Sequence, residues 1–271
     1  MRISRRRFLR GAALAGGGAA AGLAAVPIKQ WLGPDRLPLD GGYAPAAQDV
    51  SHLHNPGTSV TYYVKTSEPV VAFTFDDGPG PHWTKLVLDV LDDFRAPATF
   101  FMVGRNLRDH ADLVRGRLDR HELGNHSWSH PDFARLDLNA VRWQVARAHD
   151  EIHAATGRHA TLLRPPFAHI GGSTLLAANE MGYDIVLWSQ KMHEARYRDH
   201  PEGQVRDIVD HVTPGSIVLA HDVGTDDRLV AIRRLGEMLS GLNARGFRLV
   251  HVSELMALGQ GVAQPAPGTS V

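Results

Sequence analysis

The chain has 271 residues, 43% of them hydrophobic, which is long enough for one large α/β domain. Its 29 Lys and Arg residues balance 29 Asp and Glu residues, which argues against a nucleic-acid partner or an anionic membrane surface and fits a neutral substrate such as a glycan. The absence of cysteine excludes disulfides and thiolate metal sites. Histidines and carboxylates therefore remain as the metal ligands to consider.

The N-terminus has the pattern of an export signal. Ser4 to Arg10 contains a twin arginine followed by Phe-Leu, and a weakly apolar Ala/Gly run extends from Gly11 to Ala25. We predict a twin-arginine signal over residues 1–25, the twin-arginine export machinery as a partner, and an extracellular or cell-wall location. The alternative is a membrane anchor, but roughly 15 weakly apolar residues are too few to span a bilayer readily, so we expect no stable membrane span after processing.

After the signal, the distribution of strand and helix patterns predicts a single catalytic domain over residues 68–258. Residues 26–67 are predicted to be a linker and edge segment with one short strand at Tyr62–Lys65, and residues 259–271 a disordered tail. Inside the domain, strand patterns alternate with helix patterns, which is typical of a parallel sheet. The predicted strands are Val70–Phe75, Ala98–Val103, Glu122–Asn125, Leu162–Arg164, Tyr183–Leu187, Ser216–Leu219 and Phe247–Val250. The predicted helices are Trp83–Phe94, Ala111–Arg120, Leu138–Thr156, Gly172–Met181, Gln204–His211 and Asp227–Arg245.

These elements favour an α/β barrel of about seven parallel strands, complete or incomplete. In such barrels the chemistry gathers at the carboxyl ends of the strands. The first predicted strand ends at Asp76-Asp77-Gly78, where adjacent carboxylates diverge, so one can hold a metal while the other faces a water. An ordinary Asp-Gly turn is the structural alternative.

Histidines follow two further strands. His126 and His130 come after the third strand, and on one helical turn they would share a face and bind one ion. Together with Asp77 they would form an open three-ligand site for a divalent metal, zinc first, with cobalt, manganese or nickel as alternatives. His221 ends the sixth strand, where an imidazole can act as a general acid.

Other polar residues have a structural or solvent-exposed role as the simpler interpretation. Arg164 ends the fourth strand, where it could orient a carboxylate or simply precede a Pro-Pro turn. His149, His153 and His159 are among the histidines interpreted as solvated polar side chains.

Taken together, the motifs resemble those of the polysaccharide deacetylases, carbohydrate esterases that act on chitin, peptidoglycan N-acetylglucosamine and acetylxylan. The resemblance covers Val70 to Val252 and rests on four motifs in order: Thr74-Phe75-Asp76-Asp77-Gly78, His126-Ser127-Trp128-Ser129-His130, Arg164-Pro165-Pro166-Phe167 and Leu219-Ala220-His221. It implies a distorted (β/α) barrel that removes acetyl groups from an N- or O-acetylated polysaccharide.

The resemblance also implies a role for each site residue. Asp77, His126 and His130 would bind the metal, Asp76 would be the general base paired with Arg164, and His221 would be the general acid. Leu219 would help form the slot for the acetyl methyl, Phe167 would lend a backbone N–H to the oxyanion, and Trp188 would belong to the same substrate-contacting set.

The chain departs from the family pattern after Trp188. Similar enzymes usually carry two Asp three residues apart and then a Trp, where this chain has Lys191, Glu194 and Ala195. Glu194 would keep the carboxylate that tunes His221, but the aromatic wall is lost. Ala168 also follows Phe167 where a Gly is common. These changes support one alternative, a metal hydrolase of a small non-peptide amide on the same scaffold. A second alternative, a non-catalytic glycan-binding protein, requires that the metal or His221 is missing from the site.

Overall fold

A computed structural model describes residues 57–225 and 232–260 of the chain. The predicted export signal and most of the predicted linker and tail lie outside these residues. The strands are β1 (Val60–Thr61), β2 (Val70–Asp76), β3 (Thr99–Met102), β4 (Glu122–Asn125), β5 (Leu162–Leu163), β6 (Asp184–Val186), β7 (Gln190–Lys191), β8 (Ser216–His221) and β9 (Arg248–Leu249). The helices are α3 (Trp83–Asp93), α4 (Gly104–Val114), α5 (Leu138–Thr156), α6 (Gly172–Glu180), α7 (Pro201–His211), α9 (Leu235–Ala244) and α10 (Val252–Gln260), with short 3-10 turns η2 (Phe133–Arg135), η3 (Pro166–Ala168) and η4 (Glu194–Tyr197).

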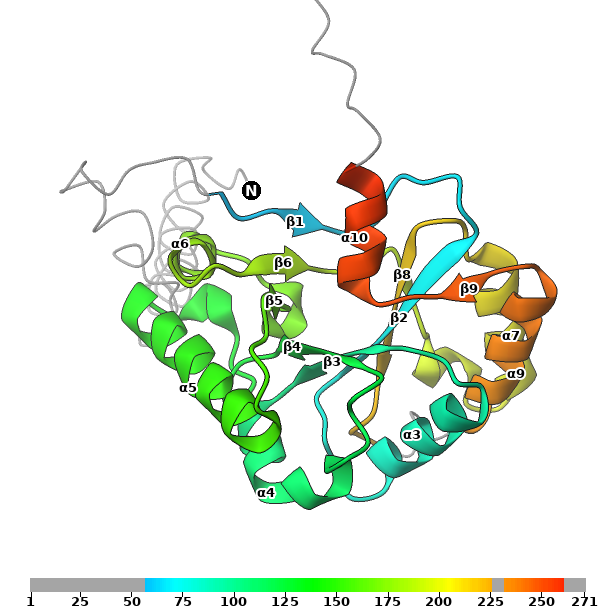
Figure 1. Ribbon diagram of the computed structural model, residues 1–271, viewed down its shortest axis with the longest axis horizontal. Coiled ribbons are helices and arrows are strands. Elements are labelled where there is room, and N and C mark those ends of the chain that lie inside the picture. The colour runs from blue at the N-terminus through cyan, green and yellow to red at the C-terminus, as the bar shows by residue number, and fades with distance from the viewer. Residues whose placement is uncertain (1–56, 226–231, 261–271) are drawn as a thin grey trace, which may run out of the picture.

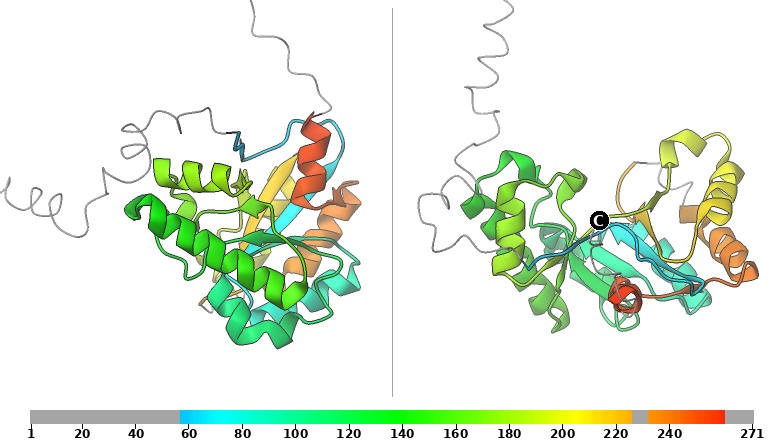
Figure 2. Two further views of the ribbon diagram at one scale, coloured as in Figure 1. Left: turned by 60° about the vertical axis from the view of Figure 1, so that its left-hand side comes forward. Right: turned by 90° about the horizontal axis from the view of Figure 1, so that it is seen from above.

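All strand pairs of the sheet are parallel, in the order β1-β6-β5-β4-β3-β2-β8-β7, with β9 beside the start of β2. Among the described residues β1 and β7 do not pair, so the barrel is open between them. Figure 1 shows the helices around the outside of the sheet, and Figure 2 shows its two flanks, with α5 and α6 on one side and α7 and α9 on the other. The predicted distorted (β/α) barrel in a single domain is confirmed.

The alternation of side chains along β2 explains both the core and the position of the cleft. Val71, Phe73 and Phe75 belong to the outer core, which the surrounding helices cover. Val70 and Ala72 belong to the inner cluster. In strands, alternate residues point to opposite faces, and β2 is buried throughout, as expected for a parallel strand covered on both faces.

Helix α10 fills the amino end of the barrel interior. Its Val252 and Leu255 are fully buried and pack in the inner cluster with Val70 and Ala72 of β2. Further along the same face of β2 the residues become polar, at Thr74 and then Asp76. The apolar end of the barrel is therefore closed by α10, and the polar carboxyl end is left for a site.

Every predicted strand of the domain is present, and the predicted helix Leu138–Thr156 has the observed bounds of α5. The predicted helix Ala111–Arg120 is wrong: α4 begins at Gly104, directly after β3. Gly104 is needed there because a Cβ would lie 2.8 Å from the ring of Trp128 and 3.0 Å from Ala148 Cα. Close packing of α4 on its neighbours thus overrides the poor helix propensity of glycine.

The structure adds β1, β7 and α10 to the predicted elements. β1 pairs with β6 at one edge of the sheet, within the predicted edge segment, although the predicted strand at Tyr62–Lys65 is reduced to an isolated antiparallel bridge between Tyr63 and Ser216. α10 extends two residues into the predicted tail. In the described part of the chain, no helix has the length and apolar character that a membrane crossing requires.

Candidate active site

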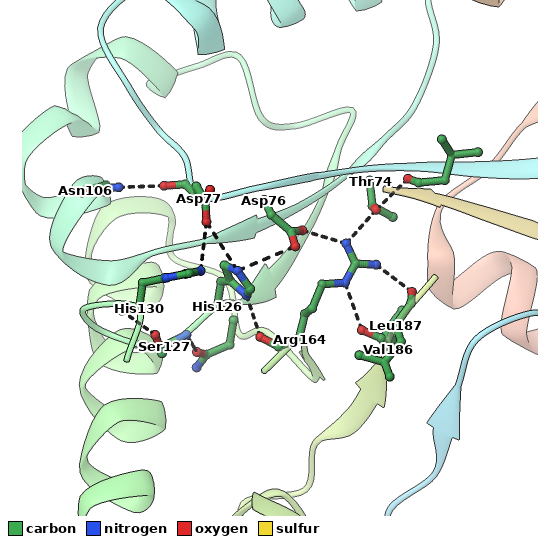
Figure 3. Close-up of polar contacts among 12 residues, drawn as sticks. Thr74, Asp76, Asp77, Asn106, His126, Ser127, His130, Arg164, Val186 and Leu187 are labelled. Atoms are coloured by element: carbon green, nitrogen blue, oxygen red, sulfur yellow. Dashed lines mark hydrogen bonds and ion pairs between the residues drawn. The ribbon is translucent and has the colours of Figure 1, made fainter. Parts of the chain in front are cut away.

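The turn after β2 separates its two carboxylates. Asp77 adopts a left-handed backbone conformation with φ 78°, and its carbonyl accepts a 2.7 Å hydrogen bond from Asn106 Nδ2. Gly78 lies against the buried Asp222, because a Cβ at this position would approach an Asp222 carboxylate oxygen to 2.3 Å. The turn is therefore shaped by packing as well as by the Asp-Gly sequence, and it gives Asp76 and Asp77 different surroundings (Figure 3).

Asp76 is held by Arg164, which is fully buried on the side of Asp76 away from the cleft. Arg164 Nη1 donates 2.7 Å hydrogen bonds to Asp76 Oδ1 and Thr74 Oγ1, while Nε and Nη2 donate to the carbonyls of Val186 and Leu187 (Figure 3). Its guanidinium also lies 4.0 Å from the centre of the Phe101 ring. Burial lowers the pKa of Arg164, and the neighbouring Asp76 charge opposes that shift. The predicted pairing of Arg164 with Asp76 is thus a buried, charge-assisted contact.

The two predicted histidine ligands lie on a loop and not on a helical turn. Asn125 Oδ1 accepts a hydrogen bond from the Ser127 N–H, and Ser127 Oγ accepts one from the His130 N–H, both at 2.9 Å. Ser127 and His130 have positive φ angles of 71° and 59°. The helical-turn argument from the sequence is therefore wrong, although the rings of His126 and His130 do meet, with centroids 4.9 Å apart.

Asp77, His126 and His130 converge on one point. Their ligand atoms all lie within 4.8 Å of one another, with Asp77 Oδ1 at 3.2 Å from His130 Nε2 and 3.5 Å from His126 Nε2 (Figure 3). Two ligands about 2.0 to 2.1 Å from a tetrahedral ion lie roughly 3.3 Å apart, so these spacings suit a shared divalent cation. His126 Nδ1 lies 2.6 Å from the Arg164 carbonyl, which fixes the ring with Nε2 towards the carboxylates.

Electrostatics at the three residues favour a cation. Burial alone would raise the pKa of Asp77, but hydrogen bonding and charge from His126, with charge from His221 and His130, hold it well below its usual range. Burial lowers the pKa of His130, and the charge of His126 lowers it further. The pKa of His126 is raised because Asp76 and Asp77 together outweigh its burial. The site therefore holds an ionised carboxylate, and protonation of one imidazole disfavours protonation of the other.

A cavity of about 330 Å³ opens over these residues at the carboxyl end of the barrel. It is lined by Asp76, Asp77, His126, His130, Pro165, Phe167, Ala168, Trp188, Lys191, Leu219 and His221. Every site residue predicted from the sequence lines this cavity except two. Arg164 is buried beneath it behind Asp76, and the side chain of Glu194 lies outside the described part of the structure.

Comparison with known proteins gives the family. The family model for polysaccharide deacetylase matches residues 63–186. A peptidoglycan-N-acetylglucosamine deacetylase of Bacillus cereus is 35% identical over 206 residues, covering 74% of this chain and 94% of the relative. The chain belongs to the polysaccharide deacetylase family.

Further relatives agree with this assignment. A chitooligosaccharide deacetylase of Sinorhizobium fredii is 34% identical over 200 residues, covering 67% of this chain and 89% of the relative. A crystal structure of a peptidoglycan N-acetylglucosamine deacetylase superposes with a TM-score of 0.69 at 25% identity, covering 73% of this chain and 92% of that structure. The protein is thus a polysaccharide deacetylase, as the four motifs predict.

In this deacetylase the opposite wall of the cleft comes from β8 and β7. Asp76 and His221 are register partners across β2 and β8, so His221 lies next to Asp76 on the neighbouring strand. Lys191 is the register partner of Leu219 and is exposed in the cleft wall. From the sequence, Lys191 is known only as the residue that stands where similar enzymes have an aspartate. Its position in the cleft follows from the pairing of β7 with β8.

Asp222 is a further polar residue of the deacetylase site that the motifs leave without a role. It is fully buried, its Oδ2 accepts a 2.7 Å hydrogen bond from Thr84 Oγ1, and its Oδ1 has no hydrogen-bond partner among the described residues. Burial raises the pKa of Asp222 to about 7. Asp222 is therefore a buried carboxyl group that packs against Gly78 in the turn after Asp77.

Strained backbone is concentrated at the cleft of the deacetylase. Six described non-glycine residues have a positive φ, and five of them are Asp77, Ser127, His130, Phe167 and Ala168. Such conformations each cost of order 1–3 kcal/mol and persist where surrounding contacts enforce them. Ala168 has a φ of 59°, a conformation that glycine adopts at lower cost, so the glycine expected here from the family resemblance would relieve strain.

Proposed function

We propose that this deacetylase is a metal-dependent hydrolase that removes acetyl groups from an N- or O-acetylated polysaccharide. The observation that carries the proposal is the convergence of Asp77, His126 and His130 next to a second carboxylate, Asp76, which a buried arginine holds in place. Three ligands beside an open cleft are typical of a catalytic metal site, because a structural site would close the fourth position with protein.

Asp77, His126 and His130 would hold one divalent ion. Two imidazoles and one carboxylate, without thiolate, suit zinc best, and cobalt, manganese or nickel also accept this ligand set. When bound, such an ion supplies Lewis-acid chemistry that polarises a carbonyl and makes water more acidic. The hydrogen bond of His126 to the Arg164 carbonyl orients one ligand ring before the ion arrives.

Asp76 is suited to act as the general base. Its Oδ1 is occupied by Arg164 at 2.7 Å, and its Oδ2 lies 3.7 Å from His126 Nε2, so the second oxygen faces the metal ligands. Arg164 therefore orients the second oxygen towards the place where the attacking water would lie. In the proposed reaction Asp76 takes the proton of the attacking water, and His221 on the adjacent strand protonates the departing amine or alcohol.

The remaining cleft residues suit a small acyl group. Leu219 is almost fully buried and Trp188 packs in the inner core cluster, so together they offer an apolar wall to the acetyl methyl. Phe167 lies edge-on to His130 with ring centroids 4.7 Å apart, and its backbone N–H is the proposed donor to the oxyanion. The cleft is open to solvent at the carboxyl end of the barrel, so an acetyl group carried on a polymer can enter it.

The substrate that fits best is an acetylated glycan of a cell wall or a related extracellular polymer. The named relatives act on peptidoglycan and chitooligosaccharides, and the predicted twin-arginine signal would place the enzyme outside the cytoplasm. Lys191 adds an exposed cation to the rim of the cleft. A glycan with a carboxylate near the acetyl group is therefore favoured over a neutral one.

Acetate release tests the proposed function. The chain should release acetate from peptidoglycan or chitooligosaccharides, and Asp76→Asn should lower kcat by roughly 10² to 10⁴ while keeping its metal, because the loss of a positioned base costs about that factor. His126→Ala should lose the ion held by Asp77, His126 and His130, and the activity with it. Metal loss in Asp76→Asn, or full activity in His126→Ala, would overturn the assigned roles.

A small non-peptide amide is the second candidate substrate, because the segment after Trp188 departs from the family pattern at Lys191, Glu194 and Ala195. A side-by-side assay on acetylated oligosaccharides and cyclic amides separates the two. Faster turnover of the cyclic amides would reassign the enzyme while leaving the metal chemistry intact.

A further inference from the structure

A cluster of three histidines lies outside the catalytic cleft, at the end of α5. His149 and His153 are four residues apart in the last turns of the helix, and His159 follows in the connection to β5. The rings of His153 and His159 stack with centroids 4.2 Å apart, and His149 Nε2 lies 3.0 Å from His159 Nδ1. Three side chains interpreted from the sequence as separately solvated therefore meet at one place on the surface.

The ring of His149 is the least exposed of the histidine cluster, and a partner in the core holds it. His149 Nδ1 lies 2.6 Å from the hydroxyl of Tyr183, which lies 3.2 Å from Asn125 Nδ2 in the core. Tyr183 is 2% exposed, so its hydroxyl is a rigid partner. This leaves His149 Nε2 as the ring nitrogen that points outward to His159. A histidine that ligates a metal is generally held by a partner on its other ring nitrogen in the same way.

The spacing within the cluster suits a metal ion. Histidines at positions i and i+4 of a helix share a face and can bind one ion. Two ring nitrogens on a tetrahedral ion lie roughly 3.3 Å apart, close to the 3.0 Å between His149 and His159. His153 is exposed, so its ring can turn from the stack on His159 towards the same point. Burial and the charges of His159 and His153 lower the pKa of His149, which favours the neutral, ligating form.

We propose that His149, His153 and His159 form a second metal site, open to solvent, for a borderline transition-metal ion such as Zn²⁺, Ni²⁺ or Cu²⁺. His149 and His159 would bind the ion as a pair after their rings tilt from the present 3.0 Å hydrogen bond, and His153 would supply the third imidazole after its ring turns. The ion takes the place of the proton that His149 and His159 share. All-nitrogen ligation selects these ions over Mg²⁺ and Ca²⁺, which prefer oxygen. The site is independent of the proposed catalytic role.

Metal stoichiometry tests the proposal in the full chain without a histidine tag. By calorimetric Zn²⁺ titration the wild-type chain should bind two ions, and His126→Ala, which disables the catalytic site, should bind one. His159→Ala should also bind one ion, and the double variant none. His200→Ala is the control, because His200 is exposed elsewhere and its side chain is 81% accessible. With Cu²⁺ in the His126→Ala background, electron paramagnetic resonance should show three nitrogen ligands, falling to two in His153→Ala.

The outcomes separate this proposal from the proposed function. Loss of one ion in His159→Ala with acetate release within twofold of wild type supports a separate site. Two bound ions in His159→Ala, or an equal loss in His200→Ala, would overturn it. A wild-type chain that binds one ion and loses it in His126→Ala would also overturn it while leaving the catalytic metal intact. Circular dichroism of each variant shows that the fold is retained.

Discussion

Replacing Arg164 with methionine should destabilise the fold by about 3 to 5 kcal/mol, the usual cost of breaking a buried ion pair. Arg164 is fully buried and supplies four hydrogen bonds, one of them to the Asp76 carboxylate, which is itself 3% exposed. Methionine fills much of the same volume but leaves Asp76 as a buried charge without its counterion. Because domains are stable by about 5 to 15 kcal/mol, the variant should lose roughly a fifth or more of its stability.

Urea unfolding at pH 7, followed by circular dichroism on metal-free protein, measures this loss without a contribution from bound ions. Arg142→Met is the matched control. Arg142 also makes two hydrogen bonds to a carboxylate, both at 2.6 Å to Glu180, but the two side chains are 41% and 39% exposed. Exposed pairs contribute about 0 to 1 kcal/mol, so Arg142→Met should cost at least ~2 kcal/mol less than Arg164→Met.

A double-mutant cycle identifies the cause of the destabilisation. If the unpaired Asp76 charge is responsible, Arg164→Met should cost about 1 to 3 kcal/mol less in an Asp76→Asn background. Equal costs in both backgrounds would show that the carbonyl contacts of Arg164, and not its pairing with Asp76, account for its effect. A loss below ~1 kcal/mol in the single variant would refute the reasoning altogether.

Three further predictions address stability, packing and specificity. Burial lowers the pKa of His121 from 6.5 to about 4, so the neutral ring contributes stability that is fully present above pH 6.5 and is lost as the pH falls towards 4. Between pH 7.5 and pH 4 the wild type should therefore lose about 3 kcal/mol of unfolding free energy that His121→Leu keeps, as measured by urea unfolding. A stability difference that does not change with pH would contradict this. Gly78→Ala should cost about 1 to 3 kcal/mol in the same assay because its Cβ would meet Asp222, whereas Gly171→Ala, with its nearest contact at 3.9 Å, should be nearly neutral. Lys191→Met should lower kcat/KM about 3- to 30-fold for glycans that carry a carboxylate and leave neutral chitooligosaccharides within twofold, as expected for a rim charge; equal effects on both substrates would remove the proposed specificity.

Much of this architecture is predictable from the sequence because its signals are local. The predicted helix over α5 has the observed ends because Asp137 caps its start by accepting a hydrogen bond from the Ala140 N–H and Gly157 ends it in a left-handed conformation. The buried, β-branched and aromatic run of β2 likewise identifies the central strand, and Asp76 and Asp77 at its end point to the site.

The features that the sequence does not reveal depend on tertiary contacts. Gly104 begins α4 because Trp128 and Ala148 approach it closely, which no local pattern records. His126 and His130 meet through a loop that Asn125 and Ser127 shape, and not through helical spacing. β7 has two residues and no periodicity, so the position of Lys191 in the cleft emerges only from strand pairing.

The most direct test of the account is acetate release by one preparation of the protein, first stripped of metal by a chelator and then supplied with two equivalents of Zn²⁺, enough for both proposed sites. We predict negligible release from peptidoglycan or chitooligosaccharides by the stripped protein and recovery on addition of zinc. Asp76→Asn should bind the zinc and stay roughly 10² to 10⁴ slower than wild type, because the proposed base acts separately from the ligands Asp77, His126 and His130. Undiminished acetate release by the stripped protein, with metal absence verified by elemental analysis, would contradict the account.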